Sequence, residues 1–140
     1  MHRVFVYGTL KRGGERNDLL KAAAFAGKAS TVASFRMLDG PYPVLRDNNG
    51  PGPGDHPVSG EVFEVDDAAL AALDDYEGVG ERLYDRIETD VAMEDGRILR
   101  AFIYVGCAGH WDREPHKLYA RLDANGHLDW QPSRTRDADH

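Results

Sequence analysis

The pattern of apolar and polar residues predicts several β-strands along this chain of 140 residues. Residues 3–9 are rich in β-branched and aromatic side chains, and residues 58–65 alternate between apolar and polar positions with one slip. We expect a further strand over residues 31–38 and a brief pairing at residues 44–45. Together these segments predict a protein built largely from short strands.

The clearest pattern predicts a β-hairpin in the second half of the chain. Its arms are residues 86–93 and 97–105, and Asp95 and Gly96 supply the turn. In the first arm, one face carries the side chains Ile87, Thr89, Val91 and Met93. This period of two is typical of a strand with one face on a core.

Two short helices are expected. Asn17 or Asp18 can cap a helix over residues 19–24, which Gly27 would end. The second helix covers Asp67–Glu77 between a cap at Asp66 and a stop at Gly78. Helices and strands do not alternate regularly, which disfavours a doubly wound parallel sheet. The sequence therefore predicts an α+β fold, a small and mostly antiparallel sheet or barrel flanked by short helices.

Residues 1–132 are expected to form one domain. Residues 47–57 concentrate Gly, Pro and Asn and predict a surface loop rather than a linker. After the hairpin, Trp111 and Tyr119 indicate partial docking on the domain, and the polar residues 133–140 are expected to fray.

Composition and charge narrow the class of function. The net charge is −7, which disfavours non-specific binding to nucleic acid and to anionic membrane surfaces. The single cysteine, Cys107, excludes an internal disulfide, and no apolar run has the length of a membrane span or the form of a signal peptide. We expect a cytoplasmic protein with no nucleic-acid or membrane partner.

The first candidate for chemistry is Glu77. On the second expected helix it shares a face with Leu70 and Leu73, about 40° from Leu73 around the axis. Asp74 and Asp75 lie about 100° and 200° from Leu73 and can face water. A carboxylate on the apolar face is partly removed from water, which raises its pKa toward a value useful to a general base. The alternative is an acid in a fraying last turn that bends to solvent.

The second candidate is the end of the first strand, Tyr7, Gly8, Thr9 and Leu10. A strand that opens into a glycine-containing turn can point successive backbone N–H groups at one place, where they bind a carboxylate or an oxyanion. The alternative is an ordinary strand exit.

Other motifs of chemistry are missing. Gly13 is followed by Gly14 and Glu15, which excludes a phosphate-binding P-loop, and no two histidines have the spacing of a helical zinc pair. Cys107 has no base partner nearby in the sequence and is expected to be an inert buried thiol. We therefore expect no metal and no cofactor.

Several motifs together resemble the gamma-glutamylcyclotransferase-like superfamily. They are Val4-Phe-Val-Tyr-Gly-Thr-Leu-Lys-Arg-Gly13, Val58-Ser-Gly-Glu-Val-Phe-Glu-Val-Asp66, Leu73-Asp-Asp-Tyr-Glu-Gly78 and Tyr84-Asp-Arg86. Within it, Tyr42-Pro-Val-Leu45, the Pro-Gly loop, Leu122-Asp-Ala-Asn-Gly126 and Pro132-Ser-Arg134 are similar to the gamma-glutamylamine cyclotransferases and their AIG2-like relatives.

The resemblance implies a compact β-barrel enzyme that cyclises a γ-glutamyl amine to 5-oxoproline and releases an amine. It implies that Glu77 is the general acid and base, and that the backbone of residues 7–10 holds the glutamyl group. Two alternatives stay open: a binding module that uses the same pocket without turnover, and a biosynthetic enzyme that removes a γ-glutamyl protecting group. Tyr84 and Arg86 either orient Glu77 or have a purely structural role.

Overall fold

The structure, a computed structural model, describes residues 1–8, 11, 20, 23–38, 44–46, 56–80, 83–106 and 122–130. Its elements follow one another as β1 (His2–Val6), β2 (Ala24–Thr31), β3 (Arg36–Leu38), β4 (Val44–Arg46), β5 (Ser59–Val65), α1 (Asp67–Glu77), β6 (Tyr84–Met93) and β7 (Ile98–Gly106). Among the described residues, no helix has the length and apolar character of a membrane span.

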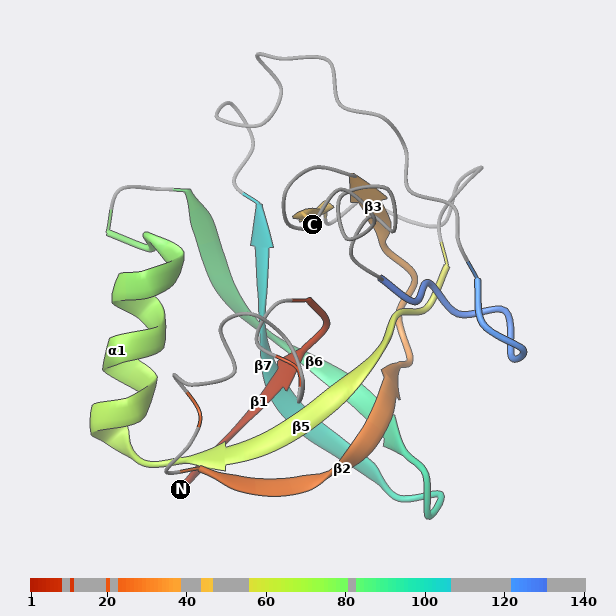
Figure 1. Cartoon of the computed structure of the whole chain (residues 1–140), viewed down its shortest axis with the longest axis horizontal. Helices are drawn as coiled ribbons and strands as arrows, with labels where there is room; N and C mark the ends of the chain where they lie inside the picture. Colours follow the sequence, from red (N-terminus) through yellow and green to blue (C-terminus); the bar gives the residue numbers. More distant parts are fainter. Residues whose placement is uncertain are drawn as a thin grey trace, which may run out of the picture.

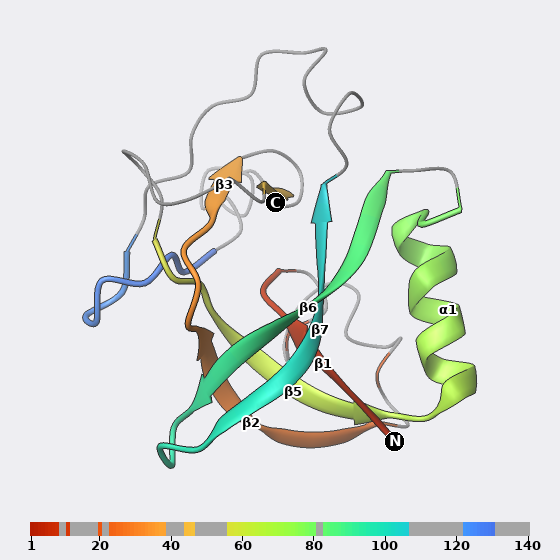
Figure 2. The ribbon, with the colours of Figure 1, turned by 180° about the vertical axis from the view of Figure 1, so that it is seen from behind.

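Five strands form a closed barrel in the order β1-β5-β2-β6-β7 (Figures 1 and 2). β1 pairs antiparallel with β5 and closes the barrel by a parallel pairing of Val4 with Phe102 on β7. The remaining pairings of the barrel are antiparallel, and β3 and β4 make a separate antiparallel pair. The predicted fold class, a small and mostly antiparallel barrel with a flanking helix, is confirmed.

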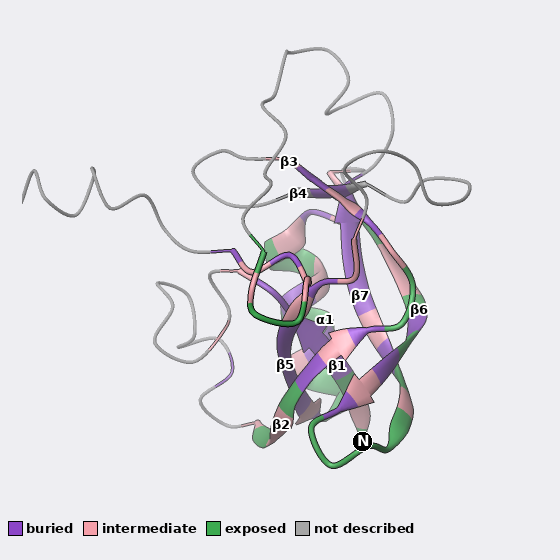
Figure 3. Ribbon diagram, turned by 90° about the vertical axis from the view of Figure 1, so that its right-hand side faces the viewer, coloured by how far each residue is buried: buried purple, intermediate pink, exposed green. Residues whose placement is uncertain are grey.

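Two apolar layers hold the barrel and α1 together. The interior of the barrel is filled by side chains such as Phe5, Val62 and Ile103, and Leu128 and Trp130 join them from the segment after β7. A second layer lies between the outside of the barrel and α1, where Leu70 and Leu73 pack against Phe63. Figure 3 shows buried positions along β5 and β7. Both faces of β5 are covered, which explains the slip in its alternation.

The helix predicted over residues 19–24 is wrong at its carboxyl end. Ala24 begins β2, and Gly27, interpreted from the sequence as a helix stop, lies inside that strand with φ 144° at a shift of register against β5. Most of the other residues of this predicted helix lie outside the described residues. Pairing with β5 decides the conformation of residues 24–27, since a short apolar run suits a strand as well as a helix.

The single strand predicted over residues 31–38 is also wrong. β2 ends at Thr31, and the chain forms β3 only from Arg36 onward. The Thr31 hydroxyl donates to the carbonyl of Ala33 at 2.7 Å and accepts from the N–H of Val58 at 2.8 Å. These side-chain bonds replace strand pairing at this point and let the chain leave the barrel. The predicted pairing at residues 44–45 is confirmed, since β4 pairs with β3.

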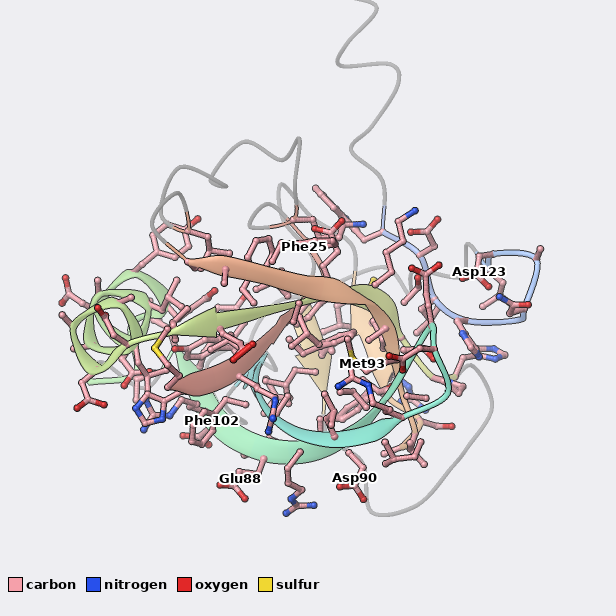
Figure 4. The ribbon with its side chains drawn as sticks, turned by 90° about the horizontal axis from the view of Figure 1, so that it is seen from below. Phe25, Glu88, Asp90, Met93, Phe102 and Asp123 are labelled. Atoms are coloured by element: carbon pink, nitrogen blue, oxygen red, sulfur yellow. The ribbon has the colours of Figure 1, made fainter. Side chains whose placement is uncertain are left out.

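The predicted hairpin is confirmed. β6 and β7 pair from Tyr84 opposite Gly106 to Ala92 opposite Ile98. The turn uses Asp95 and Gly96 as expected, and Gly96 adopts φ 92° while its N–H donates to the carbonyl of Met93. Figure 4 shows Glu88 and Asp90 on the outer face of this hairpin, where Arg100 pairs with both.

The fold brings several chain segments to one end of the barrel. α1 stands beside the barrel, and its carboxyl end lies at the same end as the start of β6 and the end of β7 (Figure 1). β1 runs toward this end, and the β3–β4 pair lies beyond it (Figure 2). The two candidate sites of the sequence, Glu77 and the exit of β1, therefore belong to one region.

Candidate active site

Glu77 is the last residue of α1, and the way the helix ends determines its position. Gly78 adopts the left-handed conformation at φ 70° and ψ 38°. Its N–H donates to the carbonyl of Asp75, and the N–H of Val79 donates to that of Asp74, which is the Schellman arrangement. The Asp66 carboxylate accepts from the N–H of Ala69 at the other end, so both predicted helix boundaries are confirmed.

The environment of Glu77 changes its acidity. The side chain is half-buried beside the apolar layer that contains Leu73 and Tyr104. Burial raises the pKa of Glu77 from its ordinary value of 4.5 to about 7. No hydrogen bond from the described residues lowers this pKa again. A carboxyl group that is half ionised near pH 7 can both take up and give up a proton.

Tyr7 lies buried at the end of β1. Its hydroxyl donates to the backbone carbonyl of Tyr104 at 2.7 Å. Burial raises the pKa of Tyr7 well above its usual value, the negative charge of Glu77 raises it further, and the backbone of Leu45 lowers it. The electrostatic effect of Glu77 on Tyr7 links the exit of β1 to the end of α1.

The exit of β1 forms a turn. The N–H of Lys11 donates to the carbonyl of Gly8 at 3.0 Å, and the Lys11 ammonium donates to the carbonyl of Trp130 at 3.1 Å. Tyr7 and Gly8 thus lie at a turn, as the sequence predicts, while Thr9 and Leu10 lie outside the described residues. The binding role predicted for these four residues stays a prediction.

A carboxylate that the sequence interpretation placed in water is part of a polar network instead. Asp74 accepts from the Tyr104 hydroxyl at 2.7 Å and, through its other oxygen, from the Arg86 guanidinium at 2.6 Å. Asp75, its neighbour in the chain, is exposed as expected. Asp74 is wrongly placed by the angular reasoning because that reasoning contains no partner from β6 or β7.

Tyr104 was missed by sequence reasoning altogether. Burial, the hydrogen bond to Asp74 and the charges of Asp74 and Glu77 raise its pKa well above the ordinary value, against a smaller opposite effect of Arg86. The signal that could have found it is the register of the hairpin, in which Arg86 lies opposite Tyr104. Cross-strand partners point to the same face of a sheet, here the face toward α1.

Other predicted features fall elsewhere. Of the loop expected over residues 47–57, His56 and Pro57 are described, and His56 pairs with Phe35. The remainder of that loop, Trp111, Tyr119, Cys107 and the tail at residues 133–140 lie outside the described residues. Tyr84 is buried in the layer beside α1, and the Arg86 guanidinium also lies 4.7 Å from the centre of the Phe102 ring. Within the described ranges, no three His, Cys, Asp or Glu side chains gather as metal ligands would.

The arrangement favours proton transfer to and from a small molecule. A carboxyl group with a pKa of about 7 lies near two tyrosines whose raised pKa values keep them neutral. A group with a pKa near the working pH is effective as both base and acid.

Comparisons with known proteins agree with this chemistry. The family described as "Gamma-glutamyl cyclotransferase, AIG2-like" matches residues 4–129. The chain is 35% identical over 152 residues to the gamma-glutamylaminecyclotransferase of Rattus norvegicus, which covers 97% of this chain and 100% of the rat protein. It is 40% identical over 108 residues to the gamma-glutamylaminecyclotransferase of Bos taurus, which covers 72% of this chain and 63% of the bovine protein. The crystal structure of an AIG2-like protein from Mus musculus matches with a TM-score of 0.67 at 34% identity, over 95% of this chain and 97% of that one.

Proposed function

The chain is an enzyme of the gamma-glutamyl cyclotransferase, AIG2-like family, and on that premise we propose that it cyclises a γ-glutamyl amine to 5-oxoproline and releases the amine. The observation that carries the proposal is the half-buried Glu77, whose pKa is raised to about 7 at the end of α1. The names of the rat and bovine relatives support an amine as the leaving group.

The reaction is an intramolecular transfer of an acyl group. The α-amino nitrogen of the substrate attacks its own γ-carbonyl carbon, the C–N bond to the amine breaks, and a five-membered lactam remains. Because nucleophile and carbonyl belong to one molecule, holding them in a reactive conformation supplies much of the acceleration. The reaction needs no nucleophile from the enzyme.

Glu77 would move the protons of this reaction. At neutral pH the α-amino group is largely an ammonium ion, which cannot attack until it loses a proton. The ionised carboxylate takes that proton, and the protonated carboxyl then gives it to the nitrogen of the leaving amine. The number of protons balances, since the amine leaves with the proton that the nucleophile lost.

The exit of β1 would hold the glutamyl group. We propose that backbone N–H groups of Tyr7, Gly8, Thr9 and Leu10 bind the α-carboxylate of the substrate or the oxyanion of the tetrahedral intermediate. The electrostatic link between Tyr7 and Glu77 supports a common pocket. Glycine at position 8 lets a ligand approach the backbone closely.

The test is to incubate the protein with γ-glutamyl-ε-lysine, a γ-glutamyl-α-amino acid and glutathione, and to measure 5-oxoproline. Glu77→Gln keeps the size of the side chain and removes the base, so turnover should fall at least about 100-fold. Asp75→Asn, an exposed neighbour on the same helix, is the matched control and should keep turnover. Normal turnover in folded Glu77→Gln would refute the role of Glu77, and no release from any substrate would refute the proposed reaction.

A further inference from the structure

The Asp74 carboxylate occupies two hydrogen-bond donors close to Glu77. One oxygen accepts from the Tyr104 hydroxyl at 2.7 Å, and the other accepts from the Arg86 guanidinium at 2.6 Å. Asp74 lies three residues before Glu77 on α1, so both side chains leave the same side of the helix. Arg86 on β6 and Tyr104 on β7 are cross-strand partners that face α1 together.

The groups that face Glu77 come from several elements. Tyr7 contributes from β1, Tyr104 from β7, and Asp74 from α1 itself, with Arg86 of β6 attached to Asp74. Tyr84 lies buried at the start of β6 in the same layer. Tyr7 gives its hydroxyl proton to the carbonyl of Tyr104. The hydroxyl protons of Tyr7 and Tyr104 are thus both committed to acceptors other than Glu77.

The engagement of these donors has a chemical consequence. A guanidinium or a hydroxyl that hydrogen bonds to a carboxylate stabilises its ionised form and makes it a weaker base. Near Glu77, the charge of Arg86 is compensated by Asp74, and the Tyr104 hydroxyl points its proton at Asp74. Glu77 is left as a carboxyl group whose acidity is governed by burial.

We propose that Asp74 is a positioning residue of the active site, which holds Arg86 and Tyr104 away from Glu77 and so preserves Glu77 as a base. The proposal rests on the proposed function, since it assigns Asp74 a role through Glu77. It also gives Arg86, whose role the sequence left open, a part in the same device.

The competing explanation is structural. The same network ties the last turn of α1 to the β6–β7 hairpin, and its loss could simply loosen the helix. A structural role predicts lower stability or lower turnover for changes at both ends of the ion pair, with the same dependence on pH. The positioning role predicts shifts of opposite sign from the two ends.

The experiment measures kcat and kcat/KM against pH with γ-glutamyl-ε-lysine for the wild type, Asp74→Asn, Arg86→Gln and Asp75→Asn. Using one substrate keeps the titration of its amino group common to all four. In Asp74→Asn, the uncompensated Arg86 and the freed hydroxyl should move the acid midpoint of the profile about one pH unit below that of the wild type. In Arg86→Gln, the uncompensated charge of Asp74 should move it upward. Asp75→Asn should leave the midpoint in place.

A further variant tests the assignment to Arg86. In Asp74→Asn combined with Arg86→Gln, the midpoint should return toward that of the wild type, because no uncompensated charge remains. If Asp74→Asn does not fold, as judged by circular dichroism, Arg86→Gln alone decides, since an unchanged or lowered midpoint there overturns the proposal. Shifts of the same sign at both ends, or none, also overturn it. Failure of the proposed function is recognised separately, by normal turnover in Glu77→Gln.

Discussion

Replacing Glu77 by Gln should make the folded protein more stable at alkaline pH. The folded chain holds a proton at Glu77 up to a pH of about 7, whereas an exposed glutamate in the unfolded chain releases it near the ordinary value of 4.5. Between these values the folded state binds more protons, so the stability of the wild type falls as the pH rises through this range. Glutamine carries no titrating group and escapes that loss.

The size of the effect follows from the difference in pKa. At 1.36 kcal/mol per pKa unit, a change from 4.5 to about 7 corresponds to about 3 kcal/mol at most. The side chain is half-buried and keeps some contact with water, which screens the charge, so we expect about 2 kcal/mol. The cost is fully present above pH 8 and absent below pH 4.

Urea unfolding at a series of pH values would measure the effect. The free energy of unfolding of Glu77→Gln minus that of the wild type should rise by about 2 kcal/mol between pH 4 and pH 8. Asp75→Asn removes a carboxylate from an exposed position of the same helix and should show a much smaller change with pH. A difference for Glu77→Gln that stays constant over this range would show that burial does not perturb Glu77, and the reasoning about its role as a base would fail with it.

Two glycine substitutions test the supports of the site. Gly78→Ala places a side chain at φ 70° and 2.7 Å from Leu83 Cδ1, so we expect a loss of about 1–2 kcal/mol in urea unfolding together with reduced turnover. An unchanged unfolding midpoint would contradict the role of the left-handed cap. In Gly60→Ala, the new methyl would lie 2.3 Å from the carbonyl oxygen of Val6, and we expect a loss of about 3 kcal/mol in the same assay. Gly80→Ala, which meets nothing within 4 Å, is the control for both, and a Gly60→Ala protein as stable as this control would show that β1 and β5 can separate there at little cost.

Local signals in the sequence were enough to predict α1 and the β6–β7 hairpin. The helix is bounded by Asp66 and Gly78, whose effects are completed within a few residues of the chain. Glu77 could be placed on the apolar face for the same reason, since its position depends only on helical geometry. The turn at Asp95 and Gly96 is likewise a local feature.

The features that the sequence left out depend on contacts between distant segments. Ala24 adopts a strand because β5 lies beside it, and no local pattern contains that information. The partners of Asp74 come from β6 and β7, and their meeting depends on the register of the hairpin. In the structure, Ala92 pairs with Ile98, so three residues form the loop between Met93 and Arg97. A loop of two residues would shift the pairing by one position and turn Tyr104 away from Arg86.

The closure of the barrel by β1 has a consequence for how an active molecule comes into being. During synthesis β1 leaves the ribosome first, yet Val4 cannot pair with Phe102 until β7 has followed. The site gathers Tyr7, Glu77 and Tyr104 from widely separated parts of the chain, so a nascent chain that stops before β7 holds none of the completed site. Pairings between such distant segments also slow folding. Activity should therefore appear only after the last strand of the barrel has been released, and the unpaired edges of β1 and β5 must be kept from other chains until then.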